Sequence, residues 1–124
     1  MQYEEIEPDF ESGPLDELTH VLPATTVREL ASSFYDSVTS CLANLDAATE
    51  AHDWSTIKEQ AHDLKGISGT FGAKRMQQLA AELEHAIGMS CAQAAVLLRE
   101  MHDTFAAARK EIDTTLEASQ SEAA

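Results

Sequence analysis

The sequence predicts an all-α protein, built as an up-and-down antiparallel four-helix bundle with a short extra helix at its N-terminal end. Apolar residues recur at spacings of three and four along most of the chain, and no run alternates in the β-branched pattern of a strand. The connections between the expected helices are short, so consecutive helices must lie antiparallel. With 124 residues, the chain has the length of a single domain.

The domain is expected to follow an acidic lead-in. Residues 1–14 contain two prolines and one glycine, and we expect this segment to be flexible. A short helix is predicted at about Leu15–Leu22, and Pro23 precedes a long second helix. The apolar stripe of the second helix consists of Val27, Leu30, Phe34, Val38, Cys41, Leu45 and Ala48.

The third and fourth helices are expected to form a hairpin. Asp53 is the predicted N-cap of the third helix, and Gly72 is expected to end or bend it. The stripe of the third helix is Ile57, Ala61, Leu64, Ser68 and Phe71. The stripe of the fourth is Met76, Leu79, Ala80, Leu83 and Ile87. Gly88 should stop the fourth helix.

A long final helix closes the expected bundle. Ser90 and Gln93 have the spacing of a capping box, which marks the start of a helix. The following stripe is Ala94, Leu98, Met101, Phe105, Ala108, Ile112 and Leu116. We therefore place the bundle domain at residues 15–117 and expect residues 118–124 to be a frayed tail.

The charge of the chain excludes several classes of partner. Twenty-two acidic and eight basic residues give a formal net charge of −14, which opposes binding to nucleic acid or to anionic lipid. The N-terminus has no secretory signal pattern, and no apolar run is long enough to span a bilayer. We expect a cytoplasmic monomer. Cys41 and Cys91 lack metal-binding spacing and are expected to be reduced thiols.

The segment from residue 61 to 73 carries the most distinctive pattern. His62 and Lys65 lie one helical turn apart, beside Gly66 and Gly69. Each glycine inside a helix costs about 1 kcal/mol relative to alanine. On a wheel of roughly 100° per residue, His62 lies about 130° from the centre of the buried stripe and should face water. The glycines on the same flank predict a docking surface, where a large partner can approach the imidazole.

Glu84 should lie beside His62 on the neighbouring helix. If the chain folds back around Gly72-Ala73, His62 and Glu84 are ten and eleven residues from the turn, and therefore level. Glu84 falls about 80° from the apolar centre of its helix, on a flank from which it could reach a neighbour.

Together these residues resemble a known family. The motif His62-x-Leu64-Lys65-Gly66-x-Ser68-x-x-Phe71-Gly72-Ala73, followed by Leu83-Glu84, resembles the histidine-containing phosphotransfer (HPt) domains of two-component phosphorelays. Through Gly69-Thr70-Phe71-Gly72, and a glutamate 22 residues after the histidine, it is also similar to the phosphoacceptor domain of chemotaxis histidine kinases. The resemblance implies that His62 carries a phosphoryl group and that Lys65 and Glu84 assist it.

The chemistry of the three side chains agrees with that implication. An imidazole nitrogen is a nucleophile only when unprotonated, and a hydrogen bond to the other nitrogen decides which one is free. Glu84 could hold Nδ1–H and leave Nε2 of His62 pointing outward. Lys65 could place its ammonium group against the phosphoryl oxygens.

Basic residues gather around the motif in an otherwise acidic chain. Lys58, Lys65, Lys74 and Arg75 are four of the eight basic residues, and all lie within residues 58–75. Such a patch suits a phosphoryl group or an acidic pocket on a partner, so we include Lys58, Lys74 and Arg75 in the predicted partner-binding surface. The alternative is that these three are ordinary solvent-facing charges.

The predicted function is that of a phosphorelay intermediate. His62 would accept a phosphoryl group from the phosphoaspartate of a receiver domain, in a hybrid histidine kinase or a response regulator, and pass it to another receiver. We expect no cofactor on this chain and Mg²⁺ on the receiver. No nucleotide-binding motif is present, so autonomous ATP-dependent kinase activity is not expected.

Three alternatives remain. A separate kinase domain could load His62 from ATP, or the chain could be a noncatalytic adaptor that binds a receiver. A metal site is suggested by Glu59-x-x-His62 and Glu82-x-x-His85, a spacing used in di-iron bundles. The helical wheel opposes it, because His85 falls about 180° from the apolar centre of its helix, whereas such ligands must face the core.

Overall fold

The computed structural model describes residues 13–86 and 88–123, with side chains through residue 118. Its helices are α1 (Gly13–Val21), α2 (Ala24–Glu50), α3 (Trp54–Thr70), α4 (Lys74–Glu84) and α5 (Cys91–Ala123). No strand occurs within these described ranges. The predicted all-α class is confirmed, and most of the expected lead-in, residues 1–12, lies outside the described part of the chain.

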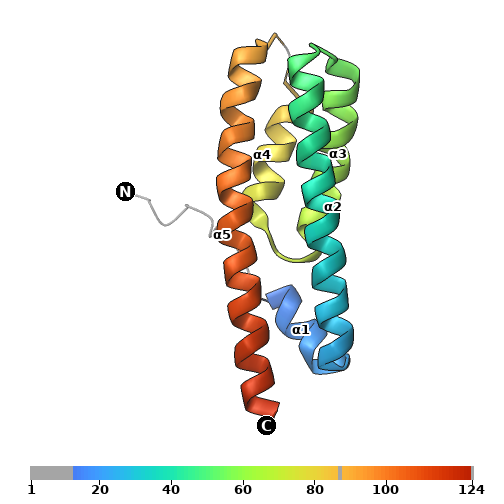
Figure 1. Ribbon diagram of the computed structural model, residues 1–124, viewed down its shortest axis with the longest axis vertical. Coiled ribbons are helices and arrows are strands. Elements are labelled where there is room, and N and C mark those ends of the chain that lie inside the picture. Colours follow the sequence, from blue (N-terminus) through green and yellow to red (C-terminus); the bar gives the residue numbers. More distant parts are fainter. Residues whose placement is uncertain (1–12, 87, 124) are drawn as a thin grey trace, which may run out of the picture.

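Helices α2 to α5 form the four-helix bundle, and α1 closes one end of it (Figure 1). Around the bundle, α3 packs between α2 and α4, and α5 packs against α2 and α4. The short α3–α4 hairpin leaves the lower part of the long α2 and α5 helices uncovered, and α1 lies there in contact with both (Figure 1). The expected architecture, including the extra N-terminal helix, is confirmed.

Most residues of the predicted stripes form the core, but Leu30 of α2 is 39% exposed and Phe105 of α5 is only partly buried. The largest fully buried side chains come from every helix and include Leu15, Leu45, Ile57, Leu64, Met76, Leu79, Leu83, Met101 and Ile112. Phe71, at the end of α3, stacks on Phe34 of α2 with ring centroids 4.8 Å apart. Phe105 of α5 packs edge-on against Phe34. Aromatic pairs contribute packing energy beyond their buried area, so this cluster anchors the C-terminal end of α3.

Local signals set the turns as the sequence predicts. The Asp53 side chain accepts a hydrogen bond from the backbone N–H of Thr56 at the start of α3. Ser90 and Gln93 form the reciprocal capping box of α5. Gly72 has a φ of 74°, a left-handed conformation that other residues adopt at a cost. The chain can therefore reverse within residues 71–73, and α4 returns along α3.

Two helix ends differ from expectation. The fourth helix was expected to continue through Ile87, but α4 ends at Glu84, and Ile87 lies outside the described residues. The backbone N–H of Ala86 bonds to the carbonyl of Leu83, a tighter turn that closes the helix. Helix α5 extends to Ala123, beyond the expected domain end at residue 117. No glycine or proline interrupts that stretch. Fraying of residues 118–124 stays a prediction.

Candidate functional site

His62 lies on the solvent side of α3, as its position on the wheel predicts. Ile57, Ala61, Leu64 and Ser68 of the same helix are buried. The side chain of His62, by contrast, is 66% exposed. The ring is therefore reachable from outside without any opening of the bundle.

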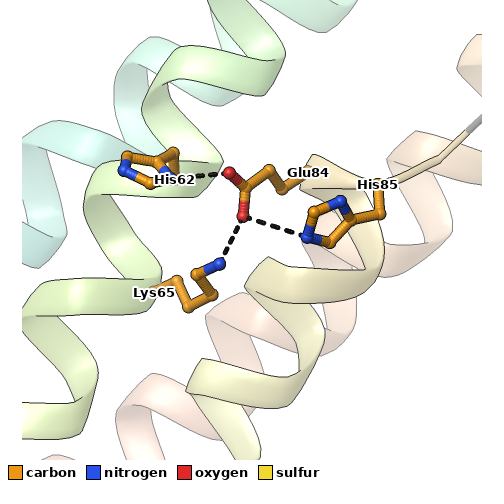
Figure 2. Close-up of polar contacts among 4 residues, drawn as sticks. All are labelled: His62, Lys65, Glu84 and His85. Carbon is orange, nitrogen blue, oxygen red and sulfur yellow. Dashed lines mark hydrogen bonds and ion pairs between the residues drawn. The ribbon is translucent and has the colours of Figure 1, made fainter.

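Glu84 holds the inner nitrogen of this ring. Its Oε2 lies 2.6 Å from Nδ1 of His62, across the α3–α4 hairpin (Figure 2). Because an ionised carboxylate can only accept, Nδ1 must carry the proton and donate it. Among the described residues, none makes a polar contact with Nε2 of His62, which points away from Glu84 (Figure 2). This arrangement is the one expected from the sequence.

Lys65 is bound to the same carboxylate. Its Nζ lies 2.7 Å from Oε1 of Glu84, while Oε2 is engaged by His62 (Figure 2). Hydrogen bonds from Lys65, first, and from His62 hold the pKa of Glu84 below its ordinary value. Glu84 is therefore ionised at neutral pH. In this structure the ammonium of Lys65 neutralises Glu84, and its expected contact with phosphoryl oxygens stays a prediction.

His85 is a site residue that the sequence reasoning missed. The helical wheel placed it opposite the apolar face of its helix, and its side chain is indeed 71% exposed. However, its Nε2 lies 3.6 Å from Oε1 of Glu84, the oxygen that Lys65 contacts (Figure 2). His85 follows the last residue of α4, where the helical wheel no longer applies. Because His85 directly follows Glu84 in the sequence, its proximity to that carboxylate could have been predicted.

The two motif glycines have different surroundings. A Cβ placed on Gly66 would meet nothing within 4 Å, which agrees with an open flank beside His62. A Cβ on Gly69 would lie 2.8 Å from Nε2 of Gln77 in α4. Gly69 therefore makes room for a neighbouring helix of the same bundle. Its inclusion in the docking surface stays a prediction.

The predicted basic patch is divided along the hairpin. Lys58 is exposed one helical turn before His62 and belongs to the same end of α3. Lys74 and Arg75 begin α4, whereas Glu84 ends it, which separates them by about 15 Å along the helix axis. Arg75 pairs with Glu100 of α5. These two residues are thus not gathered around the imidazole, and their role in partner binding stays a prediction.

The remaining histidines do not build a second site of the same kind. His102 contacts Asp46 through Nε2 at 3.0 Å, and His52 lies 3.4 Å from the sulfur of Cys91. Within the described residues, no group of three potential ligands is placed to hold a metal ion.

Comparison with known proteins agrees with this geometry. A family model of the Hpt domain matches residues 29–122, which cover most of the bundle and all of the site. The chain belongs to the Hpt domain family. This Hpt protein is accordingly a histidine phosphotransfer protein of phosphorelays, a class that interacts with receiver domains and kinases.

The fold of this Hpt protein is similar to a solved structure. That structure is the histidine-containing phosphotransfer protein B (HptB) from Pseudomonas aeruginosa PAO1, with a TM-score of 0.78 and 24% sequence identity. The match covers 91% of this chain and 98% of the HptB chain. A search of curated protein sequences finds no significant match. None of the described helices has the length and apolar character needed to cross a membrane.

Proposed function

We propose that Nε2 of His62 accepts a phosphoryl group from the phosphoaspartate of one receiver domain and passes it to a second receiver. One observation carries this proposal. Glu84 binds Nδ1 at 2.6 Å, while Nε2 lies on the exposed side of the ring. An imidazole protonated at Nδ1 has its lone pair at Nε2, where an incoming phosphorus can meet it.

The imidazole ring keeps its Nδ1 proton throughout the transfer step. The lone pair of Nε2 forms the N–P bond as the P–O bond to the donor aspartate breaks, and the aspartate carboxylate leaves with the electron pair. The imidazole then carries a proton at Nδ1 and phosphorus at Nε2, so the ring becomes cationic. The ionised carboxylate of Glu84 stabilises this charge where it develops. The return path to a second receiver is the same step reversed.

Lys65 is proposed to exchange partners during transfer. Its flexible side chain, one turn from His62, can swing from Oε1 of Glu84 towards the phosphoryl oxygens. Its ammonium would then offset the negative charge of the transferring group. The proposal needs no cofactor on this chain, since the receiver supplies its own Mg²⁺. The protein would work as a cytoplasmic monomer between a hybrid histidine kinase and a response regulator.

Purified receiver domains, phosphorylated with acetyl phosphate, provide the test. Wild type should acquire phosphate that is labile to acid, and His62→Gln should acquire none. Because His62 is exposed, the substitution should change stability by no more than about 0.5 kcal/mol, as circular dichroism and thermal melting would show. Incubation with ATP and a kinase that lacks a receiver tests the alternative donor. Phosphate on His62→Gln, or phosphate on wild type only from the receiver-free kinase, would overturn the proposal.

A further inference from the structure

A groove lies beside His62 on the side of α3 that faces α2. It has a volume of about 680 Å³ and is lined by Asp36, Ser37 and Cys41 of α2 and by His62, Asp63 and Gly66 of α3, among others. Glu84 and Lys65 are not part of its lining. Glu84 ends α4, and Lys65 pairs with it on the opposite side of His62 from the groove. A partner that reaches His62 over the open Gly66 flank must therefore pass across this groove.

The groove is acidic. Asp36 and Asp63 are exposed, and its lining contains no lysine or arginine. Burial raises the pKa of the Cys41 thiol, and the charge of Asp63 raises it further, which agrees with a carboxylate directed towards α2. The other side of His62 differs, since Lys65 neutralises Glu84 there. The two sides of the imidazole thus present different charges to a partner.

This asymmetry limits what can bind. A phosphoryl group on His62 adds negative charge close to Asp36 and Asp63, and like charges at short range repel. A partner that inserts a lysine or arginine between them removes the repulsion and adds two attractions. A second copy of this chain is a poor candidate, because it carries the same acidic groove and a net charge of −14. Complementary charge therefore favours an occupant that supplies positive charge.

We propose that Asp36 and Asp63, in the groove beside His62, select among the receivers that exchange phosphate with His62 and favour those with a lysine or arginine on the element that enters the groove. The inference rests on the proposed function, since it names the partner chemistry of the same site. It also differs from the expectation of a basic docking patch, because the charge next to the open Gly66 flank has the opposite sign. Complementary charges of this kind mainly increase association rates and specificity.

The test compares two phosphate donors. For wild type and for the Asp36→Lys/Asp63→Lys double variant, transfer from phosphorylated receivers is measured relative to acceptance from phosphoramidate. The small donor needs no groove, so the ratio removes any effect of the substitutions on His62 itself. For receivers that transfer rapidly to wild type, the ratio should fall by about tenfold or more at low salt, because steering by charge changes association rates on that scale. The difference should shrink at about 1 M salt, where the screening length is about 3 Å.

A control variant changes the net charge by the same amount as the Asp36→Lys/Asp63→Lys variant, but on another face of the bundle. Asp103→Lys/Glu111→Lys alters two exposed acidic residues on α5, the helix diagonal to α3 in the bundle. It should leave the ratio and its salt dependence at the wild-type values. A reversed charge, lysine to glutamate, in the groove-facing element of the receiver should restore transfer to the double variant.

The outcomes separate this inference from the proposed function. Equal ratios for wild type and the Asp36/Asp63 double variant, at low and high salt, would overturn the groove inference alone. If the ratio fell equally in the α5 variant, only the net charge would matter, and the groove inference would also be overturned. Failure of wild type to accept phosphate from any donor would instead remove the proposed function.

Discussion

Glu84 and His62 are joined by a 2.6 Å contact between Oε2 and Nδ1, although 22 residues separate them in the sequence. The contact decides the tautomer of the ring, because a carboxylate can only accept. Through its other oxygen, Glu84 also binds Lys65. A single carboxylate therefore contacts both the imidazole of His62 and the ammonium group of Lys65.

Glu84→Gln tests the orientation of the ring. The amide keeps a similar shape but carries no charge, so it neither fixes the Nδ1–H tautomer as firmly nor stabilises the cationic ring. We expect phosphoryl acceptance to slow by roughly 10²-fold, the usual scale for loss of one aimed electrostatic group. Nitrogen NMR of His62 should show more of the tautomer protonated at Nε2. His85→Gln is the matched control, since it removes only the 3.6 Å contact to Glu84 and should leave the tautomer unchanged.

The stabilising contacts of Glu84 should depend on pH in a defined direction. Lys65 and His62 hold the pKa of Glu84 below its ordinary value. A carboxyl group with a lowered pKa stabilises the folded state above its unfolded value, about 4.3, and loses that contribution as pH falls through the folded value. The difference in melting temperature between wild type and Glu84→Gln should therefore shrink as pH is lowered from 5 to 3. A difference that stays constant over this range would contradict ionisation-dependent contacts.

Lys65→Ala should affect both catalysis and Glu84. Removal of the ammonium should slow transfer by about 10²-fold or less, because the site is open to solvent, and it should destabilise the phosphohistidine. The hydrogen bond from Lys65 is the largest cause of the lowered pKa of Glu84, so the variant should also raise that pKa towards the ordinary value. Carboxyl carbon NMR across a pH titration would measure the change. Unchanged kinetics would reduce Lys65 to a structural partner of Glu84.

Gly66→Leu separates helix stability from access to His62. The position is open and helical, so leucine should stabilise the protein by up to about 1 kcal/mol. Transfer from a phosphorylated receiver should nevertheless fall by about 10²-fold, since small displacements from near-attack geometry are costly. Acceptance from phosphoramidate should persist. Equal loss with both donors would mean that Gly66 shapes the histidine itself, and no loss with either would end its assignment to the docking surface.

Gly69→Ala is the comparison for the second glycine. Its Cβ would displace only the flexible end of Gln77, so the fold should tolerate the change. Because this position faces α4, we expect the receiver to transfer phosphate to the variant at nearly the wild-type rate. A strong loss specific to the receiver would instead support the predicted place of Gly69 in the docking surface.

The sequence alone determined the features that depend on local periodicity and on the number of residues from a turn. The stripe from Ile57 to Phe71 sets which side of the third helix is buried, and this places His62 in water. Nearly equal chain lengths on either side of the turn at Gly72 bring Glu84 level with His62. Helix geometry is nearly constant, so such positions can be computed before the fold is known.

Only the tertiary structure decided how side chains from different helices share partners. Lys65 and Gly69 lie on the predicted flank, yet Lys65 binds Glu84 and Gly69 accommodates Gln77. Asp36 comes next to the His62 flank from α2, a relation that no spacing within the motif contains. These contacts depend on how the helices rotate and pack against one another. Packing is set by the whole core at once, and the periodicity of any single helix does not specify it.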